Sequence, residues 1–156
     1  MHVFKTHKVL NPGKGYSCVF RNWRAKSHCR FWHGYDLIFA ITLECSEPSL
    51  TEEGWVCDFG QYGYLKDRLD KHFDHKFIVA EDDPELEWAR EGHARGILDL
   101  VVMPSVGAES FTVWLAAEAT DMLQESGRLD KVNVSQAYVY ETQANSAAFM
   151  PSRYGK

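Results

Sequence analysis

The sequence has no long apolar run. None of its hydrophobic stretches approaches the roughly 20 residues that a membrane-spanning helix needs. The first fifteen residues, MHVFKTHKVLNPGKG, contain no apolar segment of the kind that drives secretion, so we expect a cytoplasmic protein. No internal repeat or low-complexity segment is present, and 156 residues are enough to bury a core. We therefore expect a single domain over residues 1–156.

Closely spaced cysteine pairs are also absent. The four cysteines, Cys18, Cys29, Cys45 and Cys57, include no C-x-x-C spacing, and without a secretory signal they indicate reduced thiols. Basic residues are outnumbered, with 17 Lys and Arg against 22 Asp and Glu and a formal net charge of −5. That sign of charge argues against nucleic acid as the main partner. Neither a membrane nor a nucleic acid is therefore expected to bind this chain.

The hydrophobic pattern predicts an α+β fold. Alternating or β-branched apolar residues predict strands over residues 16–23, 33–45, 132–142 and 147–150. Helical spacing predicts one helix that ends near the sequence FDHKF and a second from near Gly107 to about Glu125. The segment before Tyr16 is interpreted as a polar lead-in, 46–54 as a loop, 80–96 as an acidic, partly helical connection, and 97–104 as a short strand-like run. This order is typical of an antiparallel sheet with helices on one face.

The stretch SHCRFWHGY, residues 27–35, combines a cysteine with two histidines. Cys29 has cationic neighbours in sequence, and a positive environment favours the reactive thiolate. A cysteine also packs as a small buried hydrophobe, so the sequence leaves both alternatives open. Side chains at i and i+2 of a strand point to one face, yet His33 has Tyr35 at that position, and a phenol is a poor zinc ligand. His28 and Cys29 could still bind a metal beside His33, and the alternative is a histidine that hydrogen-bonds within the sheet.

Three acidic residues and one more histidine are further candidates. Asp74 precedes His75, and a carboxylate that accepts from an imidazole suits general acid–base work, provided that a turn brings the two together. Glu141 ends a predicted strand, where it can accept two parallel hydrogen bonds from an amidine-like edge or simply face solvent. Glu109 lies in the first turn of the second predicted helix, where a negative charge is favourable in any case.

These residues occur in an order that resembles the 6-pyruvoyl-tetrahydropterin synthase / 6-carboxy-tetrahydropterin synthase family. The resemblance rests on Cys29-x-x-x-His33-Gly34, GWVCDFG, FDHKF, Glu109 at a helix start, and YVYET, and it covers residues from about 20 to 149. It implies the tunnelling fold, a four-stranded antiparallel sheet with two helices on one face. It also implies a homo-oligomer, a hexamer of two stacked trimeric rings with active sites at subunit interfaces.

The resemblance also implies a role for each matching residue. Cys29 matches the catalytic cysteine, and Asp74 and His75 match the acid–base pair that activates it. Glu141 matches the glutamate that anchors the pterin, and Glu109 matches a glutamate that supports the same pocket. Zinc is the family's cofactor, held by three histidines that polarise substrate oxygens through the metal.

Zinc is where this chain departs from the family. His33 is retained, but Arg24 falls near the first ligand position and Tyr35 occupies the third. One imidazole does not hold zinc at cellular concentrations, so a rebuilt site with His28 and Cys29 and a metal-free site both stay open. Arginine and tyrosine would instead donate hydrogen bonds to an oxygen or a phosphate.

Three functions follow from this comparison of residues. The first is a lyase that removes triphosphate from 7,8-dihydroneopterin triphosphate, which in the 6-carboxy branch feeds queuosine synthesis. The second is a metal-free relative with altered, aldolase-like chemistry on a pterin or purine-like ligand. The third is a module that binds a pterin without turnover.

Overall fold

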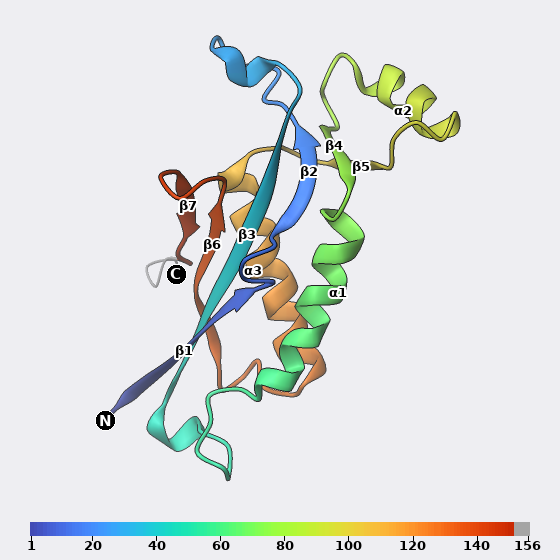
Figure 1. The fold of residues 1–156 in the computed structure, drawn as a ribbon. Coiled ribbons are helices and arrows are strands. Elements are labelled where there is room, and N and C mark those ends of the chain that lie inside the picture. The colour runs from blue at the N-terminus through green and yellow to red at the C-terminus, as the bar shows by residue number, and fades with distance from the viewer. Residues whose placement is uncertain (152–156) are drawn as a thin grey trace.

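The computed structural model describes residues 1–151, which form an α+β structure (Figure 1). Its strands are β1 (Val3–Leu10), β2 (Tyr16–Phe20), β3 (His33–Ser46), β4 (Lys76–Ala80), β5 (Leu100–Met103), β6 (Asn133–Tyr140) and β7 (Ser146–Phe149). Its helices are α1 (Gly63–His72), α2 (Leu86–Ala94) and α3 (Ala108–Glu125), with short 3₁₀ turns η1 (His28–Arg30), η2 (Glu47–Ser49) and η3 (Phe59–Tyr62). Within these residues no helix combines the length and apolar character that crossing a bilayer requires.

β3 is the strand around which the sheet is built. Its first part pairs antiparallel with β2, its second part pairs antiparallel with β1, and β6 runs antiparallel along its other edge. Because side chains alternate along a strand, Leu37, Phe39 and Ile41 share one face, and all three are fully buried. The strand predicted over 33–45 is therefore confirmed, and it ends one residue later, at Ser46.

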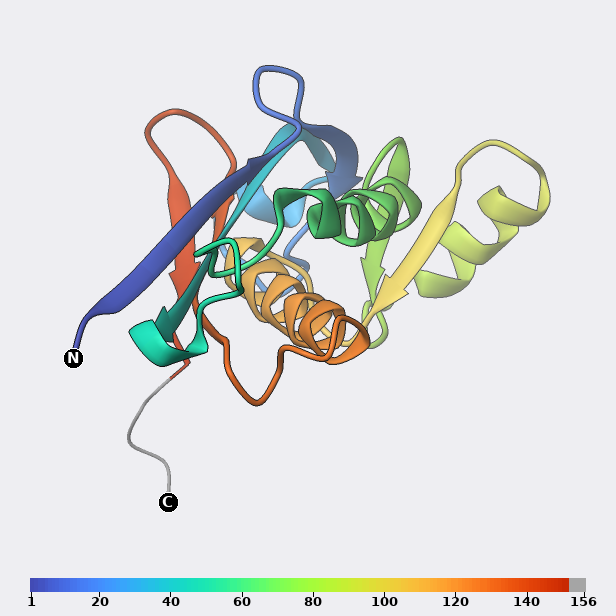
Figure 2. The same ribbon diagram turned by 90° about the horizontal axis from the view of Figure 1, so that it is seen from below.

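Helices α1 and α3 cover that apolar face of the sheet (Figure 2). Three rings join the layers, because Phe73 at the end of α1 lies 4.7 Å from the Phe39 ring and 5.0 Å from the Phe111 ring of α3. Both helices present buried residues at helical spacing, Leu65 and Leu69 on α1 and Phe111, Leu115, Ala119 and Met122 on α3. The α+β fold with helices packed on one sheet face is confirmed.

The sheet has more strands than the expected four-stranded core. The lead-in interpreted as polar contains β1, whose weak alternation reflects the exposure of half of its residues. β4 follows the Asp74–His75 turn and pairs in parallel with β2, and β5 in turn pairs in parallel with β4. The acidic connection contains α2, as the partly helical interpretation expected. Residues 81–99, which link β4 to β5 and contain α2, stand out at one end of the molecule; we call them the arm (Figure 1).

Candidate functional site

Most candidate residues meet at one end of the sheet. There β2 ends at Phe20, β3 begins at His33, β6 ends at Tyr140 and α3 begins at Ala108. The pairing of Phe20 with His33 places the first residue of β3 beside the end of β2. Residues 21–32 cross between these two strands; we call them the Cys29 loop. In Figure 1 this loop and the arm lie at the same end of the fold.

His33 and Tyr35 lie side by side on one face of β3. Their ring centroids are 5.3 Å apart with the planes nearly perpendicular, and both rings contact Phe20, at 5.3 and 5.8 Å. Phe20 in turn meets Phe111 of α3 edge-on at 5.3 Å. The i, i+2 geometry expected of a strand is therefore present, and aromatic packing fixes both side chains against the core.

Glu141 is electrostatically coupled to this pair. Burial raises the pKa of the Glu141 carboxyl above its usual range, and nearby Glu109 adds to the rise while His33 opposes it. Burial also raises the pKa of Tyr35, with further contributions from the Glu141 carboxylate and the Cys29 sulfur. Electrostatic effects thus link five predicted residues: Cys29, His33, Tyr35, Glu109 and Glu141. Tyr35 occupies the position of a zinc ligand in the family. It is a protonated phenol at neutral pH and therefore a hydrogen-bond donor.

Cys29 is the most accessible thiol of the chain. It lies in η1, where Ser27 caps the turn and accepts a hydrogen bond from the Cys29 amide at 3.4 Å. Cys29 is half-buried, whereas the other three cysteines are buried. Burial raises the pKa of Cys18 to about 12 and that of Cys57 to about 11, which keeps those thiols protonated and inert. Cys29 is therefore the thiol that a ligand in solution reaches most easily.

Glu109 enters the site from the first turn of α3. Its side chain is exposed and borders a cavity of about 290 Å³ between the Cys29 loop and the start of α3. Arg21, Trp23 and Arg24 form the opposite wall of that cavity. A carboxylate at a helix start interacts favourably with the positive end of the helix dipole.

Asp74 and His75 form a pair, but away from Cys29. The Asp74 Oδ1 and His75 Nδ1 atoms are 3.2 Å apart, and the His75 side chain is 79% exposed. His75 adopts a left-handed backbone (φ 58°), which turns the chain so that adjacent residues face each other, and its amide donates to the Ser17 carbonyl at 2.7 Å. Among the residues described, no hydrogen bond or ion pair joins this pair to Cys29. His72, in the last turn of α1, bonds the Arg68 carbonyl through Nδ1 at 2.8 Å and packs on Trp114.

The residues at the three zinc-ligand positions do not fit a zinc site. Arg24 is a cation, and its Nη2 lies 2.8 Å from Asp82 Oδ2. Tyr35 is held protonated, and His33 contributes one free ring nitrogen, because its Nδ1 lies 2.7 Å from the Phe31 carbonyl oxygen. Across residues 1–151, no three His, Cys, Asp or Glu side chains come together as possible metal ligands.

Sequence reasoning missed the residues that hold the Cys29 loop. Arg21 makes two hydrogen bonds to Asp83, at 2.6 and 2.9 Å, and Trp23 and Arg24 both bond Asp82. The available signals were the charged sequence EDD in one segment and Arg21 with Trp23 in another. The pairing itself joins residues about 60 positions apart, which no local pattern reveals.

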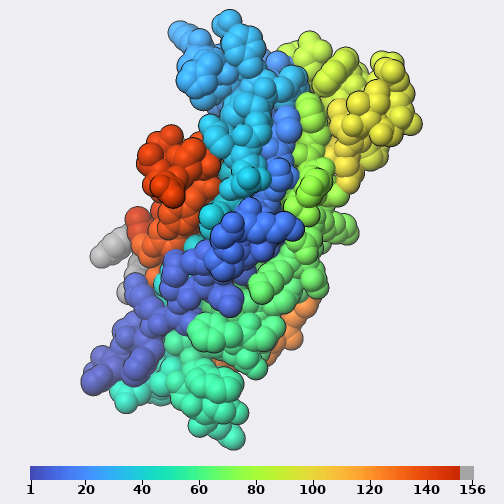
Figure 3. All heavy atoms as spheres, in the orientation of Figure 1, coloured from blue at the N-terminus to red at the C-terminus, as the bar shows by residue number. Residues whose placement is uncertain are grey.

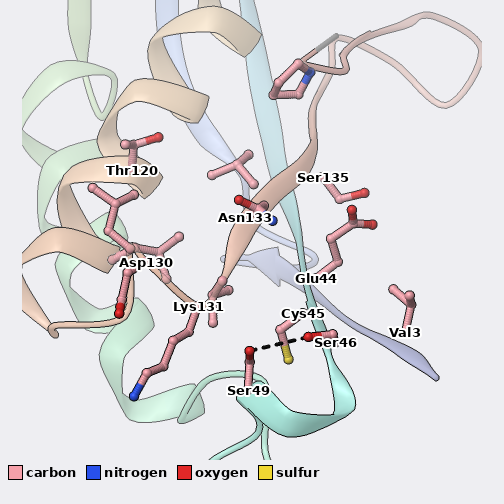
Figure 4. A pocket seen from close by; sticks show the side chains of 15 residues that line it. Val3, Glu44, Cys45, Ser46, Ser49, Thr120, Asp130, Lys131, Asn133 and Ser135 are labelled. Carbon is pink, nitrogen blue, oxygen red and sulfur yellow. Dashed lines mark hydrogen bonds between the residues drawn. The ribbon is translucent and has the colours of Figure 1, made fainter. Parts of the chain in front are cut away.

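A larger cavity, of about 780 Å³, lies away from these residues. It is bounded by the end of β3, the start of β6 and the last turns of α3, with Glu44, Lys131 and Asn133 in its wall (Figure 4). None of the predicted site residues lines it. Its size alone therefore does not make it the reaction site.

Comparison with known proteins places this geometry in a family. The chain is 26% identical over 144 residues to 6-carboxy-5,6,7,8-tetrahydropterin synthase from Aquifex aeolicus, covering 90% of this chain and 85% of that protein. It is 36% identical to the enzyme of that name from Rickettsia typhi, but over 62 residues, 39% of this chain and 44% of the enzyme.

Solved structures share the fold. An uncharacterized protein from Wolinella succinogenes superposes with a TM-score of 0.80 at 21% identity, covering 97% of this chain and all of that one. The 6-pyruvoyl tetrahydropterin synthase of Plasmodium falciparum superposes with a TM-score of 0.66 at 15% identity, covering 94% and 96% of the two chains. The family model for 6-pyruvoyl tetrahydropterin synthase matches residues 10–152. The chain belongs to the 6-pyruvoyl tetrahydropterin synthase family.

Proposed function

We propose that this protein is a pterin-converting lyase that acts on 7,8-dihydroneopterin triphosphate. The observation that carries the proposal is the meeting of Cys29, Glu109 and Glu141 around His33 and Tyr35, which joins a thiol to paired carboxylates. The family and the names of its relatives support the same class of reaction.

Glu141 is the proposed anchor for the heterocycle. An ionised carboxylate accepts two parallel hydrogen bonds from the 2-amino group and ring N–H of a pterin. Burial destabilises the ionised carboxylate of Glu141 and so raises its pKa. A ligand that donates hydrogen bonds to this carboxylate would replace the hydrogen bonds to water that burial removes. Glu109, whose charge acts on Glu141, is proposed to accept from the same ligand or to orient it.

Cys29 is the proposed base on the ligand's side chain. Its thiolate would take a proton from a side-chain carbon, and the triphosphate would leave with the electrons of its C–O bond. His75 and Asp74 of a neighbouring subunit would exchange that proton, because within one chain they make no contact with Cys29. We therefore propose a homo-oligomer, a hexamer like that expected for the family, in which each site is completed at a subunit interface. Cytoplasmic location and a place in queuosine synthesis belong to the same proposal.

We propose that the site works without zinc. The support is the donor set, since Arg24 and Tyr35 supply N–H and O–H donors where a zinc site needs metal ligands. Tyr35 would donate to a side-chain oxygen of the ligand, and His33 would share that oxygen through its free ring nitrogen.

The direct test is incubation of the full-length protein with 7,8-dihydroneopterin triphosphate. Triphosphate release and the mass of the pterin product are followed for wild type, Cys29→Ala and, as a control, Cys45→Ala in the core. We expect release by wild type and Cys45→Ala and its loss in Cys29→Ala. Failure of wild-type protein to release triphosphate, with and without added zinc, would refute the lyase.

An aldolase-like reaction is the second candidate, favoured by the same lack of zinc ligands. A retro-aldol step breaks the bond between the first two side-chain carbons after a base takes the proton of the second hydroxyl, so it needs no metal at that oxygen. Its products are a hydroxymethyl pterin and a two-carbon aldehyde, which mass analysis separates from triphosphate release. A pterin that binds and is recovered unchanged would identify a binding module instead.

A further inference from the structure

The Cys29 loop has little to hold it in place by itself. Its turn η1 contains no buried residue, and Lys26, His28 and Arg30 are exposed. Its internal bonds are local, and the one that spans it runs from the Asn22 amide to the Cys29 carbonyl at 2.9 Å. That bond closes the loop on itself, so the position of Cys29 depends on how the loop is attached to the rest of the molecule.

Asp83 holds the first residue of the loop. Its carboxylate accepts from Arg21 Nε at 2.9 Å and from Arg21 Nη2 at 2.6 Å, a bidentate pair. The Asp83 side chain is only 1% exposed, and it also accepts from the Glu85 amide at 2.8 Å. Burial alone would raise the pKa of Asp83, but Arg21 reverses that effect and the pKa is lowered. Asp83 is therefore ionised and fixed at neutral pH.

Asp82 and Trp88 hold two further parts of the loop. One Asp82 oxygen accepts from Trp23 Nε1 at 3.1 Å and the other from Arg24 Nη2 at 2.8 Å. At the far end of the loop, the Trp32 ring stacks on Trp88 of α2 at 6.4 Å and contacts Phe77 at 4.6 Å. All of these partners except Phe77, which lies in β4, belong to the arm. Figure 3 shows the loop and the arm as neighbouring projections at one end of the molecule.

We propose that the arm is a positioning device for Cys29, with Asp82 and Asp83 as positioning residues. The inference rests on the proposed function only in taking Cys29 as the reacting thiol. Arg21, Trp23, Arg24 and Trp32 bracket Asn22, whose amide holds the Cys29 carbonyl, so the arm sets where the thiol lies relative to Tyr35 and Glu141. Arg24, at a family ligand position, thereby serves as an anchor for the loop.

The first test needs no substrate. Full-length Asp83→Asn and Asp82→Asn are compared with wild type in native trypsin cleavage after Lys26 and in iodoacetamide labelling of Cys29, each located by peptide mass. We expect cleavage to quicken by about tenfold, equivalent to about 1.4 kcal/mol of local opening, and labelling to change with it. Glu87→Gln is the control, because it removes an arm carboxylate that pairs with Arg90 and makes no contact with the loop.

The pairing is tested by a double variant, Arg21→Gln with Asp83→Asn. Its cleavage rate should match that of either single variant, because both remove the same bond. If Asp83→Asn does not fold, the half-exposed Asp82 still allows the test. Unchanged cleavage and labelling in a folded Asp82→Asn protein would overturn the proposal.

Turnover then separates positioning from general stability. With the pterin substrate, Asp83→Asn should lower kcat by roughly tenfold to a hundredfold with little change in KM, because a misplaced reacting group loses rate while Glu141 still binds the ring. Adding Asp83→Asn to Cys29→Ala should cause no further loss. A further loss in that background would overturn the role in positioning Cys29. If loop anchoring is found but wild-type protein is inactive, the proposed function fails and the anchoring stands.

Discussion

At the scale of single residues, the candidate site contains several ionisable side chains that are half-buried. Glu141, Tyr35 and His33 are all half-buried, and burial raises the pKa of the Glu141 carboxyl and of the Tyr35 phenol. Such a cluster is less stable than an apolar one of the same shape, which is a common property of sites that bind polar ligands.

Glu141→Gln should lower the affinity for the pterin without destabilising the fold. The folded protein holds more protons than the unfolded chain between the ordinary pKa of 4.5 and the raised value, so Glu141 makes stability fall as pH rises through that window. Glutamine removes this cost, so the unfolding midpoint at pH 7 should stay equal or rise. Affinity for 7,8-dihydroneopterin, measured by fluorescence titration, should drop by about a hundredfold, the scale of two charge-assisted hydrogen bonds.

The wild-type protein should also bind the pterin more weakly as pH falls through the raised pKa of Glu141, because only the carboxylate accepts both bonds. Glu125→Gln, at the far end of α3, is the control and should leave affinity unchanged. Full affinity in Glu141→Gln would contradict the anchor role.

His75→Asn should reduce turnover and leave the fold intact. His75 holds a left-handed backbone that asparagine tolerates better than most residues, so no new strain arises. Loss of a general acid–base group lowers kcat by about 10²–10⁴-fold. Unfolding in urea and single-turnover rates are measured for this variant and for His72→Asn as the control. His72→Asn should lose stability, because it removes contacts with Arg68 and Trp114, but it should keep its turnover rate.

At the scale of elements, the turn between β1 and β2 determines how β3 is shared between them. Asn11 and Gly15 both take left-handed backbones, and the Asn11 side chain donates to the Gly15 carbonyl at 2.9 Å. This turn ends β1 and lets β2 continue in the same direction along the other half of β3. Gly15 passes so close to Asp36 that a Cβ would lie 2.9 Å from its carbonyl oxygen.

Gly15→Ala should therefore destabilise the fold more than Gly13→Ala. Both glycines have positive φ, so alanine costs about 1–2 kcal/mol at either position. At Gly13 a Cβ meets nothing within 4 Å, whereas at Gly15 it meets backbone that cannot move aside. Urea unfolding at neutral pH measures the difference, and equal losses for the two variants would show that the turn relaxes.

At the scale of the whole molecule, the separation of His75 from Cys29 is the main finding. One chain carries both halves of the proposed acid–base machinery at different places in the fold, with His75 exposed. The proposed site shared between subunits would account for that arrangement, since the exposed pair of one chain could then meet the Cys29 loop of another.

Mixing subunits tests this arrangement. Cys29→Ala and His75→Asn proteins should each be nearly inactive alone, and refolding them together should restore a fraction of wild-type turnover, because some interfaces then combine an intact Cys29 with an intact His75. Two Cys29→Ala preparations mixed in the same way are the control. No recovery in oligomers shown by mass to be mixed would place both groups in a single chain.

Much of this protein follows from its sequence because the signals are local. Alternation from His33 to Cys45 and helical spacing from Phe111 to Met122 arise from burial on one face, so the central strand and the long helix were predictable. The ordered set from Cys29 to Glu141 likewise identified the family and most of the residues that meet at the end of the sheet.

What the tertiary structure decided depends on contacts between distant segments. β1 is exposed and β4 is short, so their own patterns carry little signal, and pairing with β3 and β2 defines them. The tertiary fold likewise determines the hydrogen bonds of Asp82 and Asp83 to the Cys29 loop, and the separation of His75 from that loop. Local sequence determines which residues bury or react, whereas only the closed fold determines which of them meet, because such contacts join residues far apart in the chain.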